Sequence, residues 1–298
     1  MPVSGFSPLR LQAALFFGTL LLSFSALSAG VKVVYPANQT ASDTRFNDLV
    51  EILDTALKAT AAEFGAYELA PSRYGMNESR YLMELQRGDE AVTVVWSSTS
   101  VDKEKDFLPL RIPLRKGILG YRIALIAKDQ QALIDQIQTL DDLKKRSIGQ
   151  GMGWGDVKLY EANGLTVMTA QYHNLFEMVT GGRFDLFPRG ISEVFHEYDT
   201  YSKKNPDLAI EKNLLIYYPW PYYFFFNKND AKLKDRIEVG IRKMMKDGSF
   251  DAIFKKYNGA AIEKADLKHR RIIKIDNKLL PKETPLNDAS LWFDPKKY

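Results

Sequence analysis

The thirteen residues Leu214–Phe226, which read LLIYYPWPYYFFF, carry no charge. A membrane helix needs about 20 apolar residues, so this run is too short to span a bilayer. Ile, Tyr and Phe favour extended backbone, while Pro219 and Pro221 forbid a continuous helix or a central strand. The pattern predicts a strand over Leu214–Tyr218, a kink at the prolines and a second strand over Tyr222–Phe226. We interpret it as a return crossing between two packed lobes.

Strand-like and helix-like patterns alternate along the rest of the chain. Short apolar runs predict strands at Val31–Val34, Ala91–Trp96, Tyr121–Ala127, Ser147–Gln150, Leu165–Met168, Phe184–Phe187 and Ile272–Ile275. Apolar residues at helical spacing predict helices around Leu49–Leu57 (N-cap Ser42 or Asp43), Asn77–Leu85, Asp156–Asn163, Asn174–Thr180, Leu233–Met244 and from an N-cap at Ser249. Thr139 and Asp142 form a capping box. This alternation predicts α/β lobes, each a mixed sheet flanked by helices. We take Tyr121–Ala127 as the outgoing crossing.

The first thirty residues differ from this pattern. Arg10 is their only charge, and the apolar run Leu11–Leu22 is followed by the small-residue segment Ser23–Gly30. These features are typical of a secretory signal peptide, although two cleavage sites fit. We therefore expect residues 1–29 to be a signal peptide, 30–121 and 222–298 to form lobe 1 with a C-terminal extension, and 122–221 to form lobe 2.

Composition narrows the class of protein. The 298 residues include no cysteine, so neither a lipoprotein anchor nor a disulfide scaffold is expected. We expect a soluble, exported and non-lipidated monomer in a Gram-negative periplasm. The formal charge of +4 is too small for a nucleic-acid footprint, and residues 260–298 carry nine Lys or Arg against six Asp or Glu. The histidines are scattered and Gly151-x-Gly-x-Gly155 lacks a dinucleotide spacing, so we expect no metal or cofactor.

Several landmarks occur in a recognisable order between residues 31 and 259. They are Gly88 through Ser100, Asp106-Phe107-Leu108-Pro109, Thr139-Leu-Asp-Asp-Leu143, Gly182-Arg-Phe-Asp185, Asp247-Gly-Ser-Phe and Tyr257-Asn-Gly259. In this order they resemble the type II periplasmic solute-binding proteins, in particular the amino-acid-binding family (family 3) of ABC importers. The resemblance implies a two-lobed fold with two hinge crossings and a cleft that closes on a small solute.

The chain departs from that family where the ligand would bind. The family's carboxylate-clamping Arg follows the strand and its Ser/Thr turn. Counting from Gly88 puts this position at Lys103, and counting back from Asp106 puts it at Val101. A lysine there would lack the bidentate fork of arginine. The family's Gly-Thr turn at the start of a second-lobe helix is Gly153 and Trp154 here.

The largest departure concerns the acid that grips the ligand's ammonium in the family. An ungapped alignment puts Gly190 in its place, and a one-residue gap puts Arg189 there. Burying an ammonium beside a guanidinium would cost several kcal/mol. We therefore expect this chain not to bind ordinary α-amino acids in the family's manner.

The candidate ligand-binding residues are Tyr35, Trp96, Ser98, Lys103, Gly153, Trp154 and Arg189. For Arg189 the alternatives are an anion clamp at the cleft floor and a surface arginine paired with Glu193. Tyr35, Trp96 and Trp154 could stack on a ligand or form core edges. A basic run from Arg111 to Lys128 could steer a ligand, dock a partner or simply be solvated.

Three functions remain open. The first is a solute-binding protein for a small anionic or aromatic ligand, serving an inner-membrane ABC permease or a sensor. The second is a dehydratase-like periplasmic enzyme in which Glu193 acts with Lys103 or Arg189. The third is a non-transporting accessory protein whose basic tail docks a partner.

Overall fold

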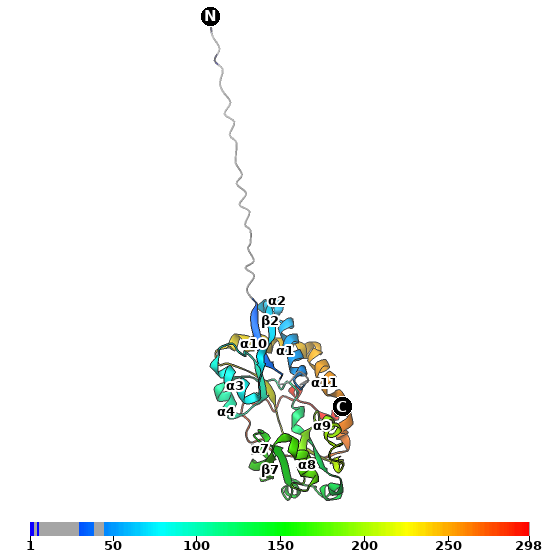
Figure 1. Ribbon diagram of the computed structural model, residues 1–298. Helices are drawn as coiled ribbons and strands as arrows, with labels where there is room; N and C mark the ends of the chain where they lie inside the picture. Colours follow the sequence, from blue (N-terminus) through cyan, green and yellow to red (C-terminus); the bar gives the residue numbers. More distant parts are fainter. Residues whose placement is uncertain (3–4, 6–29, 39–44, 298) are drawn as a thin grey trace.

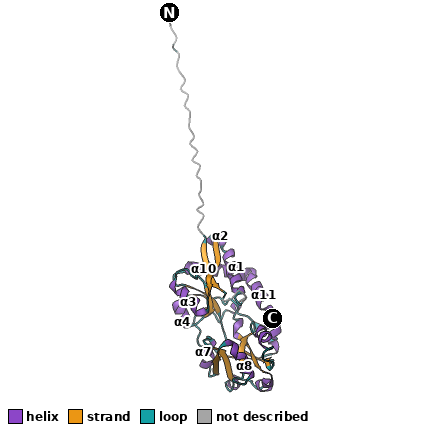
Figure 2. Cartoon of the chain, in the orientation of Figure 1, coloured by secondary structure: helices purple, strands orange, loops and turns teal. Residues whose placement is uncertain are grey.

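The fold is known from a computed structural model, which describes residues 1, 2, 5, 30–38 and 45–297. Most of the predicted signal peptide and the candidate N-caps Ser42 and Asp43 lie outside these residues. Figure 1 shows two bodies of mixed sheet and helix, the upper one marked by α1, α3 and α10 and the lower one by α7 and α8; Figure 2 shows that each combines strands with flanking helices. The predicted α/β, two-lobed fold class is confirmed.

Lobe 1 contains two small sheets. The parallel pair is β1 (Val31–Ala37) and β2 (Tyr67–Gly75), and the antiparallel sheet has the order β3 (Val95–Ser98), β11 (Tyr222–Phe226), β4 (Leu108–Leu110). The helices are α1 (Asn47–Ala59), α2 (Ala61–Phe64), α3 (Glu78–Arg87), α4 (Val101–Asp106) and α10 (Ala231–Asp247). The rings of residues 223–226 in β11 are fully buried in the core of this lobe, which is why this part of its sequence is continuously aromatic, while Tyr222 at its start is partly buried.

Lobe 2 is built on a mixed sheet. Its strands run β12 (Arg271–Lys274), β10 (Leu214–Tyr217), β5 (Tyr121–Ala127), β8 (Phe187–Gly190), and β9 (Leu208–Ile210) also pairs with β5. A parallel pair, β6 (Ser147–Gly151) and β7 (Thr166–Ala170), lies beside it through a bridge from Ile148 to Leu186. The helices are α5 (Gln131–Ile134), α6 (Leu140–Leu143), α7 (Asp156–Ala162), α8 (Leu175–Thr180) and α9 (Val194–Tyr201). β5 is buried along its whole length.

The two lobes are connected by the crossings that the sequence predicts. The outgoing chain runs from β4 in lobe 1 through a 3₁₀ turn, η1 (Ile118–Gly120), into β5, and the return chain runs from β10 through the two prolines into β11. The crossings touch each other, because Tyr218 N–H donates to the carbonyl of Gly120 at 3.2 Å. A Cβ on Gly120 would lie 1.9 Å from the carbonyl oxygen of Tyr218, so this approach requires glycine.

The C-terminal part of the chain departs from the prediction. Helix α11 (Ser249–Ala265) has Phe250 and Ile253 in the core of lobe 1 but Ile262 in the core of lobe 2. Strand β12 then joins the sheet of lobe 2 beside β10. Residues 260–298 therefore do not simply fold back over lobe 1 as expected. The remaining 3₁₀ turns are η2 (Lys128–Gln130), η3 (Tyr172–Asn174), η4 (Leu267–His269), η5 (Ala289–Leu291) and η6 (Pro295–Lys297).

Candidate ligand-binding site between the lobes

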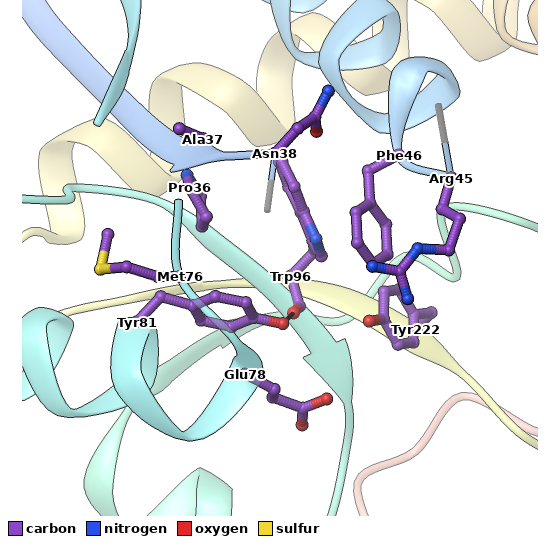
Figure 3. Close-up of a pocket in the computed structure, with 10 residues that line it drawn as sticks. All are labelled: Pro36, Ala37, Asn38, Arg45, Phe46, Met76, Glu78, Tyr81, Trp96 and Tyr222. Carbon is purple, nitrogen blue, oxygen red and sulfur yellow. Dashed lines mark hydrogen bonds between the residues drawn. The ribbon is translucent and has the colours of Figure 1, made fainter. Parts of the chain in front are cut away.

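A pocket of about 130 Å³ opens in lobe 1 at the ends of β1 and β3 (Figure 3). Four of its ten lining residues carry an aromatic ring, and Arg45 and Glu78 bring both charges to it. The lining residues are Pro36, Ala37, Asn38, Arg45, Phe46, Met76, Glu78, Tyr81, Trp96 and Tyr222. The pocket therefore combines ring faces that can stack on a flat or apolar part of a small molecule with polar groups that can bind its polar part.

Trp96 is the central ring of this pocket. Its centroid lies 5.3 Å from that of Phe46 and 6.2 Å from that of Tyr35, both in tilted arrangements. The hydroxyl of Tyr81 donates to the carbonyl oxygen of Trp96 at 2.8 Å and so holds α3 against β3 (Figure 3). Of the candidate residues, Tyr35 and Trp96 are thus brought together, with Trp96 in the pocket wall and Tyr35 half-buried behind it.

The indole N–H of Trp96 is a buried donor without a partner among the described residues. Buried donors are almost always satisfied, and leaving one unmade costs about 1–3 kcal/mol. Because Trp96 lines the pocket, a bound molecule with an acceptor atom could satisfy this group.

Lys103 sits beside the pocket but is engaged within lobe 1. Its ammonium donates to Glu78 at 2.8 Å, to the hydroxyl of Ser97 at 2.5 Å and to the carbonyl of Ser98 at 2.9 Å. Ser97 in turn donates to Glu78 at 2.5 Å. A carboxylate of the protein therefore already occupies the place beside Lys103 where a ligand carboxylate was expected.

The glycine-rich loop of lobe 2 serves to seat Trp154. A Cβ on Gly151 would lie 2.1 Å from the indole of Trp154, so only glycine lets the ring lie over the end of β6. Gly153 has φ +80°, which favours glycine, and its surroundings are open. Gly155 lies close to Ser98, since its Cβ would be 3.9 Å from the Ser98 hydroxyl. Ser98 of lobe 1 and this loop thus meet across the cleft.

Arg189 is buried inside lobe 2, with 5% of its surface exposed. Its Nε and Nη2 atoms donate to the two carboxylate oxygens of Glu197 at 2.6 and 2.7 Å, and its guanidinium lies 4.5 Å from the ring centroid of Trp154. A contact with Glu193 at 3.2 Å is also present. The expected pairing with Glu193 thus exists, but not on the surface. The guanidinium fork that an anion clamp would need is filled by Glu197.

Glu193 supplies the carboxylate that the sequence seemed to lack. Its Oε2 accepts from the backbone N–H of Gly190 at 3.0 Å and would lie 3.0 Å from a Cβ at that position. It therefore fills the space that an acidic side chain at residue 190 would occupy. Arg122 lies 3.5 Å from it on the other side.

The charges around Glu193 control its protonation. Burial alone would raise the pKa of Glu193, but Arg189, Arg122 and the N–H of Gly190 together hold it below its ordinary value. Asp156 at 3.4 Å is a second carboxylate for Arg122, whose Nε is buried and has no partner among the described residues. The floor of the cleft in lobe 2 is therefore a network of alternating charges rather than a positive surface.

The basic residues between Arg111 and Lys128 each contact a different acceptor in the structure. Within this run, Arg111 meets Glu104, Arg115 meets Asp48, Lys116 meets Asp251, Arg122 meets Asp156 and Glu193, and Lys128 meets the carbonyl of Pro206. The run therefore presents no continuous cationic surface.

Sequence reasoning missed several pocket residues. Phe46 and Tyr222 were assigned to a helix face and to the return crossing, and Glu78 to a helix start. Their positions in the chain were the only available signal: Phe46 directly precedes α1, Tyr222 begins β11 and Glu78 begins α3. Within the described residues there is no group of three or more His, Cys, Asp or Glu arranged for a metal ion, and no helix is long and apolar enough to cross a membrane.

Comparison with solved structures identifies the fold. An ancestral arginine-binding protein bound to arginine has a TM-score of 0.51 and 19% identity, covering 78% of this chain and 99% of that chain. An amino acid ABC transporter substrate-binding protein from Streptococcus pneumoniae, bound to L-arginine, has a TM-score of 0.52 and 16% identity, covering 76% and 94%. A periplasmic binding protein from Salmonella typhimurium with high arginine specificity has a TM-score of 0.51 and 12% identity, covering 76% and 99%.

No sequence-family model matches the chain, and no curated protein sequence is similar to it. At these identities the structural likeness shows the fold alone. That fold is the one of the type II solute-binding proteins, so the resemblance drawn from the sequence is confirmed at this level.

Proposed function

We propose that this chain is a periplasmic solute-binding protein whose lobes close around a small molecule, with a flat apolar or aromatic part of that molecule held in the lobe 1 pocket. The observation that carries the proposal is the buried indole N–H of Trp96, a donor with no partner among the described residues, in a wall of a pocket within a fold used for solute binding. The ligand would bring an acceptor atom to this donor and stack against the rings of Phe46 and Tyr222.

The geometry favours an aromatic or apolar ligand over a purely anionic one. An anion clamp needs a cation with free donors, and the fork of Arg189 is bound by Glu197 while Lys103 is bound by Glu78. The pocket volume of about 130 Å³ lies below the usual range for drug-sized ligands, roughly 300–1,000 Å³. A single ring or a short chain is therefore the expected size.

Arginine and glutamine, which are bound by structural neighbours, fit this pocket less well. A ligand guanidinium would need a free carboxylate, and the rim carboxylate of Glu78 is already held by Lys103. Displacing Lys103 would leave its ammonium without that partner, at a cost. We infer that basic amino acids bind weakly or not at all.

The setting of this function follows from the signal peptide expected at residues 1–29. We propose export to the periplasm without lipidation, as a monomer that passes its ligand to an ABC permease or reports it to a sensor in the inner membrane. The Streptococcus pneumoniae neighbour, a substrate-binding protein of an amino acid ABC transporter, supports the first of these partners.

An enzymatic role receives less support. A general acid working near pH 7 needs a raised pKa, whereas the guanidiniums beside the half-buried Glu193 outweigh its desolvation and lower its pKa. Lys103, the other expected catalytic group, is tied to Glu78 in lobe 1. The structural neighbours named above are binding proteins.

Isothermal titration tests the proposal with four probes: benzoate, L-phenylalanine, L-arginine and L-glutamine. We expect binding of at least one of the two aromatic probes and the weakest binding for L-arginine. Trp96→Phe keeps an aromatic ring but removes the donor, which should weaken binding about five- to tenfold. Phe46→Ala removes a stacking surface worth about 0.5–1.5 kcal/mol and should have a similar effect.

Tyr257→Phe is the matched control, since it removes one polar group from an exposed ring on α11 outside the pocket lining, and its binding should equal that of the wild type. Tight binding of L-arginine that is insensitive to both Trp96→Phe and Phe46→Ala would contradict the proposal.

A further inference from the structure

The segment after α11, residues 266–297, contacts both lobes. It begins as an integral part of lobe 2. Strand β12 pairs with β10, and Arg270 reaches the fully buried carboxylate of Glu211 at 3.2 Å. Glu211 also accepts from the backbone N–H groups of Asn213 and Leu214. The start of the segment is therefore firmly anchored on lobe 2.

The segment then passes to lobe 1. Leu291 is buried in the core of lobe 1, and Trp292 packs against the same core. The indole of Trp292 covers Gly117, where a Cβ would lie 2.5 Å from the ring. Gly117 has φ +69° and immediately precedes η1, which leads into the outgoing crossing. The next residue, Phe293, is buried in the core of lobe 2.

The segment also forms hydrogen bonds with both crossings. The side-chain amide of Asn277 donates to the carbonyl of Pro219 in the return crossing at 2.9 Å. At the outgoing crossing, the N–H of Phe293 donates to the carbonyl of Lys116 at 2.8 Å, and the hydroxyl of Tyr121 donates to the carbonyl of Phe293 at 3.1 Å. Figure 1 draws α11 in orange and the C-terminus near it, at about the level where the lobes meet.

We propose that residues 266–297 form a hinge clamp that limits how far the two lobes open. A hinge made of two crossings can bend by changing a few backbone torsions. Here the same bend would have to break the bonds to Pro219, Lys116 and Tyr121 or lift Trp292 off Gly117. Hinge bending and loss of these contacts are therefore coupled, so the clamp restricts the range of interlobe distances in the ligand-free protein.

Interlobe distances test the clamp directly, because the chain has no cysteine and accepts two site-specific labels. Lys58→Cys in α1 and Lys145→Cys after α6 replace lysines whose side chains are 68% and 69% exposed, one in each lobe. Double electron–electron resonance on the nitroxide-labelled, ligand-free chain gives the distance distribution. We expect one narrow distribution for the chain with an intact clamp.

The clamp is released by combining Asn277→Ala with Trp292→Ala. The distribution should then broaden and its mean should shift by several ångströms. The control is Lys282→Ala with Leu286→Ala, two exposed positions in the same segment, and it should match the intact chain. A released variant with native far-UV circular dichroism, a cooperative unfolding transition and an unchanged distribution would overturn the proposal.

A gentler pair guards against misfolding of the released variant. Tyr121→Phe with Asn277→Ala removes only one hydrogen bond to each crossing. We expect this pair to broaden the distribution measurably, and an unchanged width would likewise refute the clamp. Because no ligand is present, the outcome is independent of whether the proposed ligand class is correct.

Discussion

At the scale of single residues, the buried charge of Arg189 stabilises the fold rather than binding a ligand. Its guanidinium is bound by Glu197 through two hydrogen bonds and covered by the ring of Trp154. Tyr172 donates to the same carboxylate at 2.8 Å. An ion pair with this many hydrogen bonds is strongly destabilised when one partner is removed, because the other is left buried and uncompensated. The pair therefore holds α9 against the sheet of lobe 2.

Glu197→Gln tests this role. The amide keeps the shape of the side chain but loses its charge, so the free energy of unfolding should fall by about 3–5 kcal/mol. Urea unfolding followed by tryptophan fluorescence measures the change. Glu161→Gln, at an exposed site in α7, is the control and should change stability by less than about 0.5 kcal/mol. Equal unfolding midpoints for the two variants would show that the buried pair does not stabilise the lobe.

Glu193 makes the stability of the fold depend on pH. Desolvation raises the pKa of Glu193 in the folded protein, but the positive charges of Arg189 and Arg122 lower it by more, so the net shift is downward. The folded state therefore binds this proton less readily than the unfolded state. The stabilisation is therefore present above the ordinary value of 4.5 and is lost as the pH falls through the lower, folded value. The gap in melting temperature between wild type and Glu193→Gln should be largest near pH 7 and should shrink below about pH 4. A gap that stays constant from pH 7 to pH 3 would contradict this.

The ion pairs of individual residues could be predicted from the sequence only in part. Glu193 is close to Arg189 in sequence and was named as its partner, but Glu197 lies eight residues on, on α9, and reaches the guanidinium only through the fold. The same holds for Lys103 and Glu78, which are 25 residues apart. Charge patterns identify which residues need partners. Three-dimensional packing decides which partner is nearest.

At the scale of elements, the glycines of the loop Gly151–Gly155 leave the space in which the ring of Trp154 lies. Gly151→Ala should push the indole of Trp154 away and destabilise the fold by about 1–3 kcal/mol, because its Cβ would fall 2.1 Å from that ring. Gly153→Ala is the matched control: it carries the strain of φ +80° but meets no neighbouring atom. Near-UV circular dichroism should change for Gly151→Ala only. Equal spectral changes in both variants would exclude the steric explanation.

Elements with a strong pattern were predicted closely, and edge elements were not. Tyr121–Ala127 and Tyr222–Phe226 are strands with the predicted bounds; every residue of the first and all but Tyr222 in the second are buried, which gives both a continuous apolar pattern. Strand β2 was missed because Pro71 interrupts its pattern. A proline is tolerated in an edge strand, and among the described residues β2 is an edge strand that pairs with β1 alone. The strand expected at Phe184–Phe187 begins at Phe187 instead.

Helix starts were predicted where a side chain does the capping. Asn77 accepts from the N–H of Arg80, and Thr139 and Asp142 form the expected capping box. Ser249 was wrong as an N-cap, because Gly248 takes that position in a left-handed conformation and the hydroxyl of Ser249 is buried without a partner among the described residues. A cap residue and the first helical residue look alike in sequence when a glycine precedes them.

At the scale of the whole molecule, the lobes are joined more extensively than the two predicted crossings imply. Helix α11 begins in the core of lobe 1 and ends in that of lobe 2, and the segment after it passes back again. Sequence could not show this, because the C-terminal residues carry no landmark and their apolar positions, Leu291 and Phe293, are too sparse for a periodic pattern. The lobe boundaries predicted at residues 121 and 222 stay a proposal, and the extension belongs to both lobes.

Shared cores make the two lobes a single cooperative unit in unfolding. If lobe 1 unfolded alone, α11 would lose the packing of Phe250 and Ile253 while Phe254 and Ile262 stayed buried, which is incompatible with one continuous helix. Differential scanning calorimetry of the full chain should therefore give one transition with a calorimetric to van't Hoff enthalpy ratio of about 1. Urea unfolding curves from tryptophan fluorescence and far-UV circular dichroism should coincide. Two resolved heat-capacity peaks, or separated curves, would mean that α11 breaks at its middle and that the lobes are thermodynamically independent.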